Sequence, residues 1–135
     1  MYFVDTNIFI RFLTNDHPTK ARKCFELLGN ANQGKIKLQT TESVISEIVY
    51  ILSSKRLYNL PRVDITQKLM PVLKISKLAI PQKRTLMKAL EIYVDYKIDF
   101  EDAILIANMY RTKTKEIFTY DEGFEKIPQI KRLKP

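Results

Sequence analysis

The apolar residues of this chain follow two spacings, short continuous runs and longer stretches in which every third or fourth residue is apolar. The first spacing is typical of buried strands and the second of amphipathic helices. Residues 2–4 form an apolar run that ends at Asp5, and residues 8–13 then follow a helical spacing. Further strands are predicted at residues 35–39, 78–80, 116–120 and 130–133, and further helices at residues 18–28, 41–54, 60–73, 81–96 and 100–111. Short strands that alternate with helices predict βαβ units and a mainly parallel sheet covered on both faces.

Residues with strong backbone preferences mark the boundaries of these elements. Gly29 is predicted to end the helix that Pro18 opens, and Thr40 or Thr41 to cap the next one. Pro71 is expected to kink its helix or end it early, because a proline inside a helix removes a backbone hydrogen bond.

The stretch KIDFEDAILIANMY places three acids directly before an apolar helical pattern. At about 100° per residue, Asp102 shares the face of Ile106, whereas Glu101 lies opposite and Ile104 falls among the polar residues. Asp99 sits at the N-cap position. Asp102 could simply complement the helix dipole. That role does not explain an inward position, where an unpaired carboxylate costs several kcal/mol.

Three other acids lie where a ligand could reach them. Asp5 and Asp121 directly follow predicted strands, and ligands of parallel sheets bind outside the carboxyl ends of strands. Glu47 lies at the margin of the apolar face of its helix. Each has a structural alternative, since Asp5 could cap a helix, Asp121 could begin a D-E-G turn, and Glu47 could be a solvated boundary residue.

The composition excludes several kinds of catalytic site. Cys24 and His17 are each alone, which argues against a disulfide framework, a Cys/His zinc site, paired histidines and a Cys–His dyad. The three glycines are too scattered for a phosphate-binding loop or a dinucleotide-binding motif. Any catalysis is therefore expected to rest on carboxylates.

Length and charge narrow the class of protein. A chain of 135 residues predicts a single domain over residues 1–135, and the absence of a signal peptide or membrane span predicts a cytoplasmic location. The formal charge is +8, from 23 Lys and Arg against 15 Asp and Glu. This excess favours a polyanionic partner, although a solvated lysine-rich surface would also account for it.

Clustered carboxylates under a basic surface are typical of a nuclease. Two carboxylates about 4 Å apart repel by about 1 kcal/mol in water and by more at lower dielectric. A hard divalent cation such as Mg²⁺ or Mn²⁺ relieves this repulsion and keeps positions open for phosphate oxygens. Such an ion activates water for attack on a phosphodiester.

Four segments in order resemble the PIN-domain family, and in particular its VapC-type toxins. They are VDTNIFIRFL, EIVYIL, DFEDAILIA and TYDEGFEKI, followed by a closing RLKP. The resemblance covers nearly the whole chain. It implies a three-layer α/β/α, Rossmann-like fold with a mainly parallel five-stranded sheet, and a Mg²⁺- or Mn²⁺-dependent endoribonuclease. It also implies a metal site made of Asp5, Glu47, Asp102 and Asp121, with Asn7 and Thr119 in supporting positions.

The resemblance also implies partners. Members of this type usually form homodimers and are inhibited by a small antitoxin of the VapB type encoded beside them. A PIN-like module that binds or processes RNA without a toxin role, or with little activity, is the alternative. A phosphatase of the haloacid dehalogenase type also starts with an aspartate after the first strand, but it needs a second aspartate where Asn7 stands.

Overall fold

The computed structural model describes all 135 residues and shows a mixed α/β protein with parallel strands. Its backbone contacts divide into two compact units, an amino-terminal unit of Met1–Lys83 and a carboxy-terminal unit of Arg84–Pro135. None of its helices is both long and apolar enough to cross a membrane.

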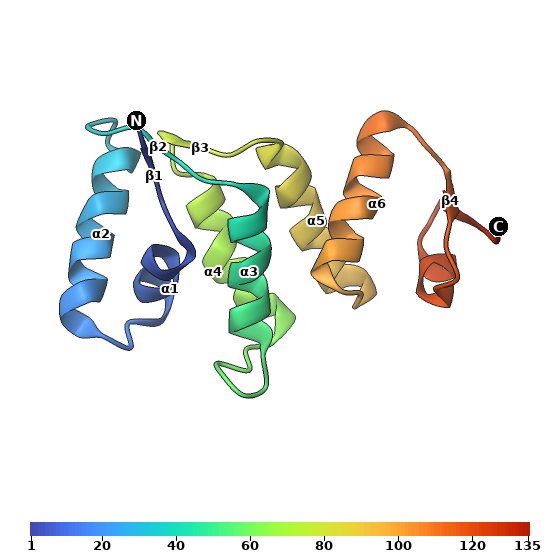
Figure 1. Cartoon of the computed structure of the whole chain (residues 1–135), viewed down its shortest axis with the longest axis horizontal. Coiled ribbons are helices and arrows are strands. Elements are labelled where there is room, and N and C mark those ends of the chain that lie inside the picture. Colours follow the sequence, from blue (N-terminus) through green and yellow to red (C-terminus); the bar gives the residue numbers. More distant parts are fainter. The chain divides into compact units, whose positions relative to one another are not determined.

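The amino-terminal unit holds a three-stranded parallel sheet in the order β1-β2-β3 (Figure 1). Tyr2 pairs with Leu38, and Leu38 pairs with Leu78, so the three strands begin and end at nearly the same level. Pairs of helices connect successive strands, which is the predicted βαβ arrangement. The elements are β1 (Tyr2–Phe3), α1 (Thr6–Thr14), α2 (Pro18–Asn32), β2 (Leu38–Gln39), α3 (Glu42–Ser53), α4 (Arg62–Leu73) and β3 (Leu78–Ala79).

The core of this unit comes from the apolar faces of its helices together with the central strand. Its largest fully buried side chains are Phe9, Leu28, Leu38, Ile45, Ile48, Leu52, Ile65, Leu69, Leu73 and Leu78. Burial of side chains of this size at about 25 cal/mol per Å² of apolar surface is the main stabilising contribution to such a fold.

The carboxy-terminal unit carries two helices and a two-stranded parallel sheet. Glu116 pairs with Lys131 and Phe118 with Leu133. Tyr93 and Phe100 pack edge to face with ring centroids 5.8 Å apart, which joins its two helices. The elements are α5 (Lys83–Tyr96), which begins at the unit boundary, α6 (Phe100–Thr112), β4 (Glu116–Phe118), the 3₁₀ helix η1 (Glu122–Lys126) and β5 (Lys131–Leu133).

Two boundary predictions were wrong. The second helix does not end at Gly29 but continues to Asn32, because Ala31 extends its buried face, and Gly34 takes the left-handed conformation instead. The helix predicted to open at Pro81 begins at Lys83. Pro71 lies in the last turn of α4, which ends two residues later at Leu73.

The five predicted strands are all present, but they form one sheet of three and another of two. The two sheets belong to different units. A single five-stranded sheet and a single domain over residues 1–135 therefore stay predictions.

Candidate functional site

Asp5 is held at the carboxyl end of β1 by backbone and side-chain bonds around it. The Val4 amide donates to the Gln39 carbonyl at 2.9 Å, and the buried Thr40 hydroxyl donates to the Val4 carbonyl at 2.8 Å. Asp5 caps α1, since its Oδ1 accepts from the Thr6 amide at 2.7 Å. The capping role, given above as the structural alternative for Asp5, is thus present. Capping uses one carboxylate oxygen and leaves Oδ2 for another ligand.

Thr6 connects Asp5 to Glu47. Its side chain is buried, with only 4% of the residue exposed, and its hydroxyl donates to Glu47 Oε2 at 2.7 Å. Glu47 itself is exposed on α3, which Thr41 caps by accepting from the Val44 amide. This hydrogen bond orients the glutamate at the end of the sheet where Asp5 stands.

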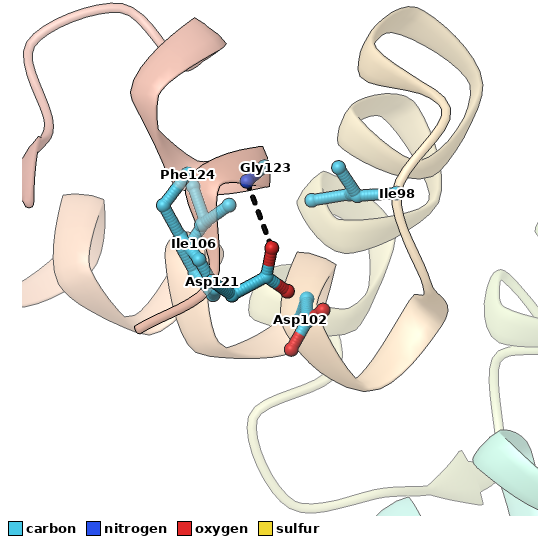
Figure 2. A pocket seen from close by; sticks show the side chains of 6 residues that line it. All are labelled: Ile98, Asp102, Ile106, Asp121, Gly123 and Phe124. Atoms are coloured by element: carbon cyan, nitrogen blue, oxygen red, sulfur yellow. Dashed lines mark hydrogen bonds between the residues drawn. The ribbon is translucent and has the colours of Figure 1, made fainter. Parts of the chain in front are cut away.

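Asp102 and Asp121 line one small cavity in the carboxy-terminal unit (Figure 2). The cavity measures about 10 Å³, which is enough to hold about one water molecule. Its other walls are mostly apolar and come from Ile98, Ile106, Gly123 and Phe124. The two carboxylates lie side by side in Figure 2.

Electrostatics at this cavity disfavour the charged form of Asp102. Burial raises the pKa of the Asp102 carboxyl, and the negative charges of Asp121, Asp99 and Glu101 raise it further. No cation in the structure forms an ion pair with Asp102, because the ion pairs present involve other residues. A cation bound between Asp102 and Asp121 would relieve this repulsion.

The helix that carries Asp102 has the orientation predicted from periodicity. Asp102 is half-buried and Glu101 is exposed. Asp99 occupies the N-cap position of α6, although its side chain makes no capping hydrogen bond. Ile104, placed among the polar residues by the helical wheel, is buried, so the wheel was wrong at that position.

The turn after β4 fixes Asp121. Its amide donates to the Thr119 hydroxyl at 3.0 Å, and its Oδ1 accepts from the Gly123 amide at 2.8 Å. The D-E-G turn, given above as the structural alternative for Asp121, is therefore present. A Cβ at Gly123 would stand 3.0 Å from Asp121 Oδ1, so any other residue there would crowd this carboxylate.

Arg132 on β5 supports the same turn. Its guanidinium donates to Glu125 Oε1 through two nitrogens, at 2.9 and 2.6 Å, and to the Tyr120 carbonyl at 3.3 Å. The side chain is only 9% exposed. The ion pair ties η1 to β5, and the hydrogen bond to Tyr120, which directly precedes Asp121, ties the turn to β5.

The structure thus places the four predicted acids as two pairs. Asp5 and Glu47 belong to the amino-terminal unit, and Asp102 and Asp121 to the carboxy-terminal unit. No group of three or more His, Cys, Asp or Glu side chains is gathered closely enough to hold a metal ion. A site made of all four acids stays a prediction.

Of the two predicted supporting residues, the side chain of Thr119 makes a hydrogen bond and the side chain of Asn7 makes none. Thr119 accepts from the Asp121 amide, whereas Asn7 is exposed and makes no side-chain hydrogen bond. Sequence reasoning missed Thr6 and Arg132. A threonine directly after the capping Asp5 was a local signal for the first, but no local signal marked the second.

Comparison with known proteins gives one further finding about the whole chain. A family model described as the PIN domain matches residues 2–130. A search of curated proteins finds no match.

Proposed function

The chain belongs to the PIN domain family, whose members are generally metal-dependent nucleases, and we propose that it is a Mg²⁺- or Mn²⁺-dependent endoribonuclease. The observation that carries the proposal is the cavity shared by Asp102 and Asp121. Both carboxylates line this cavity, and burial together with the charge of Asp121 raises the pKa of Asp102. Such a pair is unfavourable unless it has a ligand of positive charge.

The donor set fits a hard divalent cation. Carboxylate oxygens are the ligands that Mg²⁺ and Mn²⁺ prefer, and the cavity is small. Asp102 and Asp121 would hold the ion together with Asp5 and Glu47. When bound, the ion supplies a water activated for attack on a phosphodiester and stabilises the negative charge that develops.

The chain's own residues prepare this site. Thr6 orients Glu47 toward the end of the sheet, and the Gly123 amide fixes one oxygen of Asp121. Thr119 holds the turn, and Asn7, exposed one residue beyond Thr6, would orient a water or a substrate oxygen. Such positioning is effective because it is completed before substrate binds.

We also propose that the two sheets join as one five-stranded parallel sheet. β1 is an edge strand, and β4 pairs on one side only. Phe3 on β1 and Phe118 on β4 are 71% and 69% exposed, which is unusual for large apolar side chains of strands. Pairing of β1 with β4 would bring Asp5 and Asp121 to the same edge, since each lies just beyond the carboxyl end of its strand.

RNA cleavage tests the proposal. Purified protein should cleave single-stranded RNA with Mg²⁺ or Mn²⁺ and lose this activity with EDTA. Asp102→Asn should lower kcat by about a hundredfold to a thousandfold, since removal of one group of an electrostatic site costs this much. Glu101→Gln is the matched control, because it removes the neighbouring carboxylate that faces solvent, and it should keep nearly full activity.

The stability of the Asp102→Asn variant shows whether a loss of activity reflects lost catalysis or a lost fold. Metal-free Asp102→Asn should be at least as stable as the wild type, because the substitution removes repulsion between like charges. Full cleavage by Asp102→Asn would overturn the site. RNA binding without metal-dependent cleavage would instead identify a PIN-like module for RNA binding or processing.

We propose further that the enzyme is the toxin of a VapBC-type pair, acting in the cytoplasm as a homodimer and inhibited by a small VapB-type antitoxin. The four motifs, which resemble those of this type of toxin, support this role. Induced expression should arrest growth, whereas expression of Asp102→Asn should not. A small neighbouring gene whose product restores growth and copurifies with the chain would identify the antitoxin. Unimpaired growth with active enzyme would argue against a toxin.

A further inference from the structure

A second hollow lies in the amino-terminal unit, where it begins at the amino ends of the strands and continues along β3. It measures about 410 Å³. Lys37 directly precedes β2 and Lys77 directly precedes β3, and both line the hollow together with Lys83 and Ser76. Asp5 follows β1 at the opposite ends of the parallel strands, so the hollow is separate from the carboxylates.

The charge of this hollow is uncompensated. Three lysines line it and no Asp or Glu does. None of these lysines belongs to an ion pair, and the ammonium groups of Lys37 and Lys77 donate no hydrogen bond within the protein. Their positive charge is therefore free to attract an anion.

Lys83 strengthens this conclusion because its ammonium is partly removed from water. It donates to the Leu78 carbonyl and lies 3.5 Å from the Ile75 carbonyl. Burial lowers the pKa of this amine. Neutral carbonyls offset the lost hydration of a cation only in part, so an anion in the hollow would stabilise it further.

The rim of the hollow is fixed in advance. Ser76 bonds to the carboxyl end of α2 through its hydroxyl, which donates to the Asn32 carbonyl at 3.1 Å, and through its amide, which donates to Asn32 Oδ1 at 3.4 Å. These bonds hold the backbone before Lys77. A fixed rim lowers the entropy that a ligand must overcome on binding.

The distribution of charge over the chain points to a polyanion. Residues 1–83 carry 13 Lys and Arg against 6 Asp and Glu, a net charge of +7, whereas residues 84–135 carry 10 against 9, a net charge of +1. The basic excess of the protein thus lies almost wholly in the unit that contains the hollow.

We propose that this hollow binds a phosphate of the RNA backbone at a distance from the scissile bond, so that it anchors substrate without taking part in chemistry. This inference rests on the proposed function, because it takes RNA as the substrate. Tyr2 pairs with Leu38, so Lys37 lies four residue positions along the strands from the level of Asp5. At about 3.3 Å per residue, these two levels are about 13 Å apart. The hollow therefore serves RNAs longer than a few nucleotides.

The test compares two double substitutions of equal charge. Lys37→Ala with Lys77→Ala removes the two exposed lysines of the hollow, and Lys83 is kept because it also bonds to backbone. Lys20→Ala with Lys23→Ala is the control, since both are exposed on α2 and neither makes an ion pair or lines the hollow. Binding of a labelled RNA of about twelve nucleotides is measured by anisotropy, without metal, over a range of salt.

The Lys37/Lys77 variant should bind several-fold more weakly than the wild type. The slope of log affinity against log salt should fall by about 0.7, because each phosphate of a single strand that is neutralised adds about 0.7 to this slope. In cleavage assays KM should rise with kcat unchanged, since the hollow would hold the phosphate equally in ground and transition states. A trinucleotide should show no such difference.

An equal loss of binding in the control pair would overturn the proposal, because it would reflect net charge alone. Unchanged binding and slope in the Lys37/Lys77 variant would also overturn it. The binding measurement needs neither metal nor cleavage. If the wild type does not cleave RNA, the binding measurement still shows whether the hollow holds RNA. If the Lys37/Lys77 variant binds normally, cleavage by the wild type still supports the nuclease function.

Discussion

At the scale of single residues, Thr6 shows how one buried hydroxyl can prepare a site. It donates to Glu47 Oε2 at 2.7 Å across 41 residues of sequence, and its amide donates to Asp5. Replacement by valine keeps the shape of the side chain and removes only the donor. Glu47 would then lose its fixed orientation while remaining hydrated.

Thr6→Val should weaken Mn²⁺ affinity by about tenfold, the lower end of what loss of a supporting hydrogen bond costs a metal site. The free energy of unfolding should fall by about 1 kcal/mol. Calorimetric titration and thermal melts measure the two effects. Thr14→Val is the control, because the Thr14 hydroxyl donates to the Ile10 carbonyl of the same helix and bonds to none of the four acids. Equal metal affinity in wild type and Thr6→Val would show that Thr6 has no positioning role.

At the scale of elements, two contacts join separate segments of the chain. Asp16, after α1, accepts from Tyr58, after α3, and from Arg11 at 3.2 Å. The hydrogen bond from Tyr58 lowers the pKa of Asp16 below its usual 3.8, with Arg11 contributing in the same direction. This contact therefore makes stability depend on pH.

The sign follows from linkage. The native state binds the Asp16 proton less tightly than the unfolded state, so the contact stabilises the fold above pH 3.8 and the gain is lost as pH falls through the lowered pKa. Tyr58→Phe should lower Tm slightly at pH 7, by up to a few degrees. The difference between the two proteins should shrink below pH 3.8. A constant difference at all pH values would contradict this account.

The second contact is the ion pair between Arg132 on β5 and Glu125 in η1. Arg132→Met should loosen the turn that carries Asp121, because the guanidinium also bonds to the Tyr120 carbonyl. Hydrogen exchange at residues 119–126 should become faster, and metal affinity should fall by about tenfold. Glu125→Gln should show a smaller effect, since an amide oxygen still accepts from Arg132. Unchanged exchange in the Arg132 variant would rule out this support.

At the scale of the whole molecule, the proposed site takes ligands from both units. Asp5 and Asp102 would then bind the same ion. Asp5→Asn and Asp102→Asn should each lower Mn²⁺ affinity strongly, and the double variant should lose little more than either alone. Independent losses that add in the double variant would mean two separate sites. Calorimetric titration of the four proteins distinguishes these outcomes.

How much could be predicted from the sequence depends on the range of the interactions involved. Periodicity separated half-buried Asp102 from exposed Glu101, and cap preferences located Asp5, Thr41 and the turn at Asp121. These features are local, since they depend on backbone geometry within one or two turns. The alternation of strands and helices was predictable for the same reason.

Long-range packing decided the rest. Burial of Ala31 carried α2 past Gly29, and burial of Ile104 overrode the helical wheel. The hydrogen bond from Thr6 to Glu47, the support of Asp121 by Arg132 and the basic hollow join residues tens of positions apart or on separate strands. By itself, the sequence determined which residues are suited to chemistry and on which element each lies. Only the tertiary structure decided which of them meet, because contacts between distant segments arise from packing of the whole chain.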